Sequence, residues 1–199
     1  MALTIHGSAR SRTMRVLWMA AELGLAFKHD PIAFDDPALK TEAFLSLNPA
    51  GAIPTLEDGD FALPESLAIN LYLAKRYGLG RLYPTSVADE AQVWRWSLWA
   101  QGQLEPWLMR DALLLELRSA LAGRTAPMIA AALATLERAL AYRPWLLGEA
   151  FTVADLNVAG VLSPSRSSEL DLAPTPAVAD WLGRCYARPA AIETRARHA

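Results

Sequence analysis

The most restrictive feature of this sequence is a change of pattern near residue 86. Before it, short strand-like runs alternate with helix-like runs, and after it every strong pattern is helical. Alternating strands and helices typify an α/β domain, whereas an unbroken series of helices forms a layer of its own. We therefore expect an α/β domain over residues 1–78, a linker over 79–88 and an all-helical domain over 89–199.

The first domain is predicted to follow the order βαβαββα. Its last helix carries Lys75 and Arg76 in the final turn, which suits the helix dipole, and Gly78 is expected to end it as a left-handed C-cap. The predicted segments are a strand over 2–6, a helix over 14–24, a strand over 27–34, a short irregular helix over 36–49, a hairpin over 50–66 and a helix over 67–78.

The hairpin segment AGAIPTLEDGDFALPES contains a proline near the start of its first strand. Asp58-Gly59 separates two apolar runs and is a dipeptide that readily forms a two-residue turn. Proline in a sheet marks an edge, a strand start or a break. Because an X-Pro bond prefers trans by only about 0.5 to 1 kcal/mol, a cis Ile53-Pro54 bond is one interpretation, and it would offer the Ile53 backbone to an extended peptide. A trans proline that only protects an edge strand is the other.

The helical half contains two local signals. Pro106 is expected to kink or divide the first long helix. Thr152, followed three residues later by Asp155, matches a capping box at the start of the helix FTVADLNVAGVL. A last helix, over 176–190, is expected to stop at Pro189.

Composition excludes several classes of function. The formal net charge is -2 and 20% of the residues are charged, which gives no electrostatic reason to expect a nucleic acid or a membrane surface as partner. Without a long apolar run or a signal-peptide pattern, the chain is expected to be cytoplasmic. Cys185 is the one cysteine, and His6, His29 and His198 are scattered, so neither a disulfide nor a metal site is expected.

Two stretches, GSARSRTMRVLWMAAELGL and LNPAGAIPTLEDGDFALPESLAINLYLAKRYG, resemble the N-terminal domain of the cytosolic glutathione transferases. The order of the later helices is similar to the C-terminal domain of that family. The resemblance implies an α/β thioredoxin-like domain followed by an all-α domain, with glutathione as co-substrate. It also implies a two-fold homodimer formed through the long helices.

The resemblance further implies a glutathione site. Ile53, just before a cis Pro54, would hold the cysteinyl part of glutathione through its backbone, and Glu65 with Ser66 would take the γ-glutamyl end. A helix start suits a carboxylate, and Glu65 can pair with the adjacent ammonium. The alternative is that Ser66 only caps the helix and Glu65 only complements its dipole. Lys40 falls where relatives place a basic residue near the glycine carboxylate, or it is an ordinary exposed lysine.

The turn HGSARSRTMRVLW contains neither tyrosine nor cysteine, so it resembles the serine-using theta and phi classes. The pattern S-x-x-x-R identifies Ser11 as the catalytic residue, with Ser8 and Thr13 as alternatives. A thiol with a pKa of about 8.5 is mostly protonated at neutral pH, and a hydroxyl at a helix start can stabilise the thiolate. Ser11 as an ordinary helix N-cap is compatible with that role.

Two further features bear on the site. Positive charge gathers in the same turn, from Arg10, Arg12 and Arg15, where it would help hold a thiolate or is simply solvated. Ala52 departs from the family, because many relatives have Gln or Lys there. We therefore expect the glycine end of glutathione to lose one contact and to bind more weakly or through Lys40 alone.

The leading hypothesis is a glutathione transferase that activates the glutathione thiol for conjugation to a small electrophile. The alternatives are a glutathione-dependent disulfide reductase or peroxidase, and a non-catalytic binding module that keeps the fold. The identity of the electrophile does not follow from the fold. The resemblance suggests Ala9, Arg10, Met109, Leu113 and the segment 162–168 as its binding residues.

Overall fold

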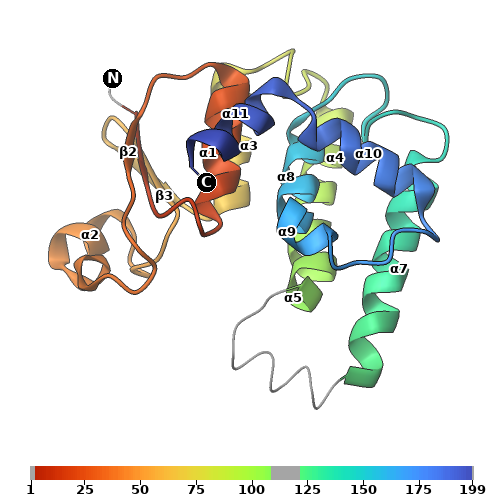
Figure 1. Cartoon of the computed structure of the whole chain (residues 1–199). Coiled ribbons are helices and arrows are strands. Elements are labelled where there is room, and N and C mark those ends of the chain that lie inside the picture. Colours follow the sequence, from red (N-terminus) through yellow and green to blue (C-terminus); the bar gives the residue numbers. More distant parts are fainter. Residues whose placement is uncertain (1–2, 109–121, 199) are drawn as a thin grey trace. The chain divides into compact units, whose positions relative to one another are not determined.

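The computed structural model describes residues 3–108 and 122–198 (Figure 1). Packing divides the chain into two units, Met1–Thr85 together with Arg188–Ala199, and Ser86–Ala187. The division falls within the predicted linker. The last residues of the chain, which the sequence analysis placed in the helical domain, group instead with the first unit.

The first unit is built on a four-stranded mixed sheet in the order β2-β1-β3-β4. β1 pairs in parallel with β2, and an antiparallel β3–β4 hairpin continues the sheet on the other side of β1. This sheet confirms the α/β thioredoxin-like class and the order βαβαββα. Its elements are β1 (Leu3–His6), α1 (Thr13–Leu23), β2 (Lys28–Asp30), η1 (Pro37–Lys40), α2 (Glu42–Leu47), β3 (Thr55–Asp58), β4 (Phe61–Pro64), α3 (Ser66–Tyr77) and α11 (Pro189–Arg197).

The helices α1, α3 and α11 lie together in the first unit (Figure 1). α1 ends at Gly24, whose φ of 67° is the left-handed C-cap that glycine favours. Gly78 ends α3 with a φ of -130°, so the left-handed cap predicted there is wrong. A Cβ at Gly78 would lie 2.7 Å from Leu23 Cδ2 and 3.0 Å from the Ala74 carbonyl oxygen, so a larger residue would crowd the ends of α1 and α3.

A partly buried ion pair joins α11 to α1. The Arg188 guanidinium donates to both carboxylate oxygens of Glu22 at 2.7 Å, and Trp18 Nε1 donates to the same carboxylate at 3.0 Å. The helix before it ends at Tyr186, and Pro189 opens α11 instead of simply stopping a helix. Proline is favoured at the first helical position because the N–H it lacks has no partner there.

The hairpin forms where it was predicted, but its turn is shifted by one residue. Gly59, with a φ of 64°, and Asp60 form the turn, whereas Asp58 still belongs to the ladder and pairs with Phe61. The prediction of an Asp58-Gly59 turn is therefore wrong by one position. The Asp58 side chain has another task, since it anchors α3 to the hairpin.

Asp58 accepts hydrogen bonds from two tyrosines of α3, Tyr72 at 2.8 Å and Tyr77 at 2.6 Å. Arg76 also pairs with it, at 3.1 Å. Burial works to raise the pKa of Asp58, but the two tyrosine bonds and Arg76 outweigh it and leave that pKa below 3.8. Burial and the bond to Asp58 raise the pKa of Tyr72 to about 12.

Tyr72→Phe is expected to lower the free energy of unfolding by about 1 kcal/mol at neutral pH, the usual value of one hydrogen bond. Because the folded state raises the pKa of Tyr72 above its ordinary 10.0, this stabilisation is complete below pH 10 and declines as the pH rises toward 12. Urea unfolding at several pH values should thus show that the native protein and the variant differ less in free energy of unfolding as the pH rises above 10. Tyr142→Phe, at a tyrosine that is 99% exposed, should change neither stability nor its pH dependence. A difference that stays constant would contradict this account.

The second unit is helical, as predicted. The first long helix is irregular next to Pro106, since α4 passes into a π-helical segment, η2, just before this proline and α5 contains the proline. Proline has no N–H for the carbonyl four residues earlier, and a π segment accommodates the lost bond. The elements of this unit are α4 (Val87–Trp99), η2 (Ala100–Leu104), α5 (Glu105–Leu108), α7 (Ala122–Leu140), α8 (Val153–Leu162), α9 (Pro164–Ser167) and α10 (Pro176–Tyr186).

The predicted capping box at the start of α8 is present. Thr152 accepts a hydrogen bond from the N–H of Ala154, and the Asp155 carboxylate accepts one from the N–H of Thr152 at 2.9 Å. Asp155 also accepts from the N–H of Leu146 at 2.8 Å and from Trp181 Nε1 at 3.0 Å. This one buried carboxylate therefore joins the loop before α8 to helix α10.

Candidate functional site

All six residues predicted for the glutathione site lie in the first unit. They come from four segments: the turn before α1, the helix η1, the loop before β3 and the start of α3. The residues are Ser11, Lys40, Ile53, Pro54, Glu65 and Ser66.

The turn before α1 holds the Ser11 hydroxyl in a local network. Ser11 Oγ donates to the carbonyl of Ser8 at 2.7 Å and accepts from the N–H of Thr13 at 3.1 Å. The hydroxyls of Ser11 and Thr13 lie 2.8 Å apart. Thr13 is fully buried, whereas Ser11 and Ser8 are half-buried. Thr13 can therefore support Ser11, but it has no surface to offer a ligand.

Gly7 brings this turn against the loop before β3. Its φ of 130° is one that glycine adopts easily and other residues rarely. A Cβ on Gly7 would lie 2.2 Å from Thr13 Oγ1 and 2.9 Å from the Ile53 Cβ. Thr13, which supports Ser11, and Ile53, which precedes Pro54, thus both pack against Gly7. This role of Gly7 was not predicted from the sequence.

Gly7→Ala is expected to lower the free energy of unfolding by about 2 kcal/mol or more, because the substitution combines backbone strain with a steric clash. Gly24→Ala is the matched control. Gly24 also has a positive φ, but nothing lies within 4 Å of its would-be Cβ, so that variant should lose only about 1 kcal/mol. Chemical denaturation of the two variants measures the comparison. Equal losses would show that the clash beside Ser11 is relieved without cost.

The loop before β3 has the predicted cis Ile53-Pro54 peptide bond. Ile53 is half-buried and precedes the first paired residue of β3, Thr55. Over the described ranges, its backbone N–H and C=O make no hydrogen bond with the rest of the backbone. Both groups are therefore available to an extended ligand beside the sheet.

Asn48 fixes this loop, a role that was not predicted from the sequence. Its side-chain amide donates to the Ala52 carbonyl at 2.8 Å and to Thr55 Oγ1 at 3.1 Å, while its oxygen accepts from the N–H of Ala50 at 3.0 Å. Asn48 is 2% exposed. An asparagine that opens a loop leading to a proline was the available signal, because asparagine readily bonds nearby backbone.

Lys40 reaches the same loop from η1. Its ammonium donates to the carbonyls of Gly51 at 3.0 Å and Ala50 at 3.3 Å. An ammonium group has three donors, so one remains for a ligand. Gly51 has a φ of 55°, and a Cβ there would lie 2.8 Å from the Lys40 nitrogen. Lys40 is therefore more than an exposed lysine, since it helps shape the loop.

The start of α3 differs from the capping alternative. Ser66 is the first helical residue, and the N-cap is Glu65, whose side chain makes no capping bond. Glu65 is exposed and has a φ of 73°, an uncommon backbone conformation that gathers at functional sites. Ser66 is buried, and Arg15 Nη1 of α1 donates to its hydroxyl at 3.2 Å.

The residues suggested for the electrophile are only partly described. Met109 and Leu113 lie outside the described residues. Ala9 and Arg10 belong to the Ser11 turn, and Ser163 in the segment 162–168 has a positive φ of 42°.

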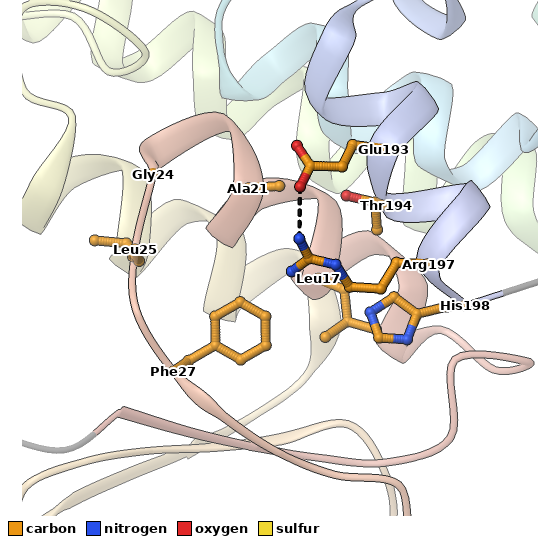
Figure 2. Close-up of a pocket in the computed structure, with 9 residues that line it drawn as sticks. All are labelled: Leu17, Ala21, Gly24, Leu25, Phe27, Glu193, Thr194, Arg197 and His198. Carbon is orange, nitrogen blue, oxygen red and sulfur yellow. Dashed lines mark hydrogen bonds and ion pairs between the residues drawn. The ribbon is translucent and has the colours of Figure 1, made fainter.

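A separate pocket of about 240 Å³ lies between α1 and α11 (Figure 2). Its rim carries the Glu193–Arg197 ion pair, and Phe27 lies on its apolar side. Burial, with His29 and Arg197 nearby, lowers the pKa of His198 at its edge. None of the six predicted site residues lines this pocket.

The remaining predictions concern metal and membrane. Among the residues with described positions, no group of three or more His, Cys, Asp or Glu side chains is arranged to hold a metal ion. Within the same ranges, every helix is too short or too polar to cross a bilayer.

Comparison with known families adds independent information. Residues 10–76 match the family model "Glutathione S-transferase, N-terminal domain", and residues 119–184 match "Glutathione S-transferase, C-terminal domain". The chain is 34% identical to glutathione S-transferase 3 of Zea mays, over 96% of this chain and 92% of that protein.

Solved structures of similar proteins agree. One is the theta class glutathione S-transferase of Xanthomonas axonopodis pv. citri with glutathione bound, at a TM-score of 0.75 and 30% identity over 97% of this chain and 96% of that one. Another is a glutathione S-transferase of Pseudomonas fluorescens, at a TM-score of 0.80 and 28% identity over 96% and 97%. By its sequence over nearly its whole length and by both of its domains, this chain belongs to the glutathione S-transferase family.

Proposed function

We propose that this protein activates the thiol of glutathione as a thiolate and conjugates it to a small electrophile. The observation that carries the proposal is that the four segments predicted to hold glutathione lie in one unit and are linked by side-chain contacts, among them the bonds of Lys40 to the loop before β3. Gly7 packs the Ser11 turn against Ile53, and Arg15 bonds Ser66. Relatives named glutathione S-transferase cover nearly the whole chain, and one similar structure contains glutathione.

In this proposal the backbone of Ile53 pairs with the cysteinyl part of glutathione. The γ-glutamyl carboxylate lies at the start of α3, where the Ser66 N–H and the positive end of the helix dipole favour an anion. Glu65 pairs with the adjacent ammonium, and the third donor of Lys40 serves the glycine carboxylate. Ala52 offers only a methyl group, so the glycine end depends on Lys40.

Ser11 is the residue we propose for thiolate stabilisation. The Ser11 hydroxyl donates a hydrogen bond to the Ser8 carbonyl. If the hydroxyl turns to donate to a ligand sulfur instead, its oxygen still accepts from the N–H of Thr13. A hydrogen bond to a charged group contributes about 1.5 to 3 kcal/mol. Lowering the thiol pKa by two units requires about 2.7 kcal/mol, so one such bond supplies most or all of it.

The alternatives predict different chemistry. A disulfide reductase or peroxidase of this family would be favoured by faster turnover of mixed disulfides or peroxides than of electrophiles. The Ser11 turn contains no cysteine to form a mixed disulfide, which supports conjugation. A non-catalytic module would bind glutathione without lowering its thiol pKa.

Calorimetric titration with glutathione, followed by assay with a halogenated nitroaromatic electrophile, tests the proposal. We expect saturable binding at one site per chain and conjugation above the uncatalysed rate. Absence of binding would overturn it, and binding without conjugation of any electrophile in a broad panel would favour the non-catalytic module.

We also propose that the chain forms a homodimer in the cytoplasm. Helix α4 presents Val87, Trp94 and Leu98 to solvent, with Leu98 71% exposed, and their spacing places them on one face. A second copy of the chain is the partner that would cover this face. Sedimentation should give twice the chain mass of 21.7 kDa, and a single-chain mass would contradict the dimer.

A further inference from the structure

We propose that Arg15 is a positioning residue that sets the Ser66 hydroxyl as a hydrogen-bond donor and so makes the site selective for a carboxylate at the γ-glutamyl position. The inference rests on the proposed function and concerns a residue that would act through Ser66. Arg15 on α1 and Ser66 on α3 are each only 4% exposed.

Chemistry fixes the direction of the hydrogen bond between Arg15 and Ser66. Arg15 Nη1 lies 3.2 Å from Ser66 Oγ. A guanidinium group has only donors, so the serine oxygen must be the acceptor. The hydroxyl hydrogen of Ser66 then points away from Arg15 and can donate to another group. A carboxylate, which only accepts hydrogen bonds, fits a hydroxyl oriented in this way.

The start of α3 is electrostatically positive. Ser66 is the first residue of a 12-residue helix whose N-cap side chain makes no capping bond, so the helix start presents its own positive end. Arg15 adds a positive charge next to this helix start, since its guanidinium bonds the Ser66 hydroxyl. Because both side chains are buried, this charge is screened less than one at the surface. An anionic ligand group gains from both contributions, and a neutral one gains little.

Arg15→Met keeps the length and the apolar stem of the side chain but removes the charge and the donors. Affinity for glutathione should fall about tenfold, as expected for a hydrogen bond that involves charge. Affinity for 4-aminobutanoyl-cysteinyl-glycine, which lacks only the γ-glutamyl α-carboxylate, should change less than about twofold.

The experiment titrates both ligands by calorimetry into four proteins: the native chain, Arg15→Met, Ser66→Ala and the double variant. If Arg15 acts through Ser66, then Arg15→Met should lower glutathione affinity less than about threefold in the Ser66→Ala background. Lys75→Gln removes an exposed charge from the same α3 helix and should leave both affinities unchanged. With saturating glutathione, kcat of Arg15→Met should stay native while KM for glutathione rises.

Three outcomes would overturn the inference. Arg15→Met could weaken both ligands equally, it could keep its full effect in the Ser66→Ala background, or it could leave glutathione affinity unchanged. If native protein binds neither ligand, the proposed function itself fails and the inference fails with it. Should Arg15→Met not fold, the Arg15 ¹⁵Nε resonance of native protein decides. It should shift on binding glutathione but not on binding the analogue, and equal shifts would contradict the inference.

Discussion

Ser11→Ala is expected to lower kcat/KM for conjugation by about 10- to 100-fold at neutral pH, with KM for glutathione changed less than about twofold. The variant loses the one hydroxyl of the turn that is half-buried and held from behind by the N–H of Thr13. Without that donor, the pKa of the bound thiol should return toward its ordinary value, so less thiolate is present. The loss should therefore shrink as the assay pH is raised.

Ser8→Ala is the matched control for this prediction. Ser8 lies in the same turn and is also half-buried, but its hydroxyl accepts only a weak bond from the N–H of Arg10, at 3.3 Å. Its carbonyl, which accepts from Ser11, remains in the variant. Native-like kinetics are expected. If Ser8→Ala lost activity and Ser11→Ala did not, the catalytic assignment would move to Ser8.

Asp155→Ala is expected to lower the free energy of unfolding by about 3 to 5 kcal/mol. The buried carboxylate accepts hydrogen bonds from the N–H groups of Leu146 and Thr152, the hydroxyl of Thr152 and Trp181 Nε1. Removing the carboxylate leaves these donors buried without an acceptor. A buried donor without an acceptor costs about 1 to 3 kcal/mol, and some of the four can find another partner after the substitution. Urea unfolding followed by far-ultraviolet circular dichroism measures the loss.

Two further variants sharpen this test. Asp180→Ala removes an exposed carboxylate from α10 and should change stability by less than about 0.5 kcal/mol. Asp155→Asn keeps one accepting oxygen and should fall between native protein and Asp155→Ala. If Asp155→Ala were as stable as Asp180→Ala, the carboxylate would not be joining α8 to α10 as described.

Local signals made most of the fold predictable. The capping box at Thr152 and the irregular helix next to Pro106 rest on chemistry within a few residues, and both are present in the structure. The turn missed by one residue shows the limit of such reasoning. Asp58 satisfies the local preference for a turn, but the tyrosines of α3 need it as an acceptor, and that contact spans the sequence.

The sequence pattern predicts candidate residues for the site, but it does not predict the residues that support them. A family resemblance selects residues such as Ser66, whereas the support from Arg15 depends on how α1 and α3 pack. No local sequence pattern marks Gly7 as important. A side chain is excluded at this position only because Thr13 and Ile53 both pack against it in the folded chain. The last helix was missed because Pro189 both follows one helix and opens another.

The most direct test of the account is the pKa of the glutathione thiol when it is bound to native protein. Ultraviolet titration of the thiolate in the complex measures it. Stabilisation by Ser11 predicts a pKa at least one unit below the value of about 8.5 for a free thiol, and a return to that value in Ser11→Ala. A bound thiol in native protein that titrates at about 8.5 would contradict the claim that this site activates glutathione.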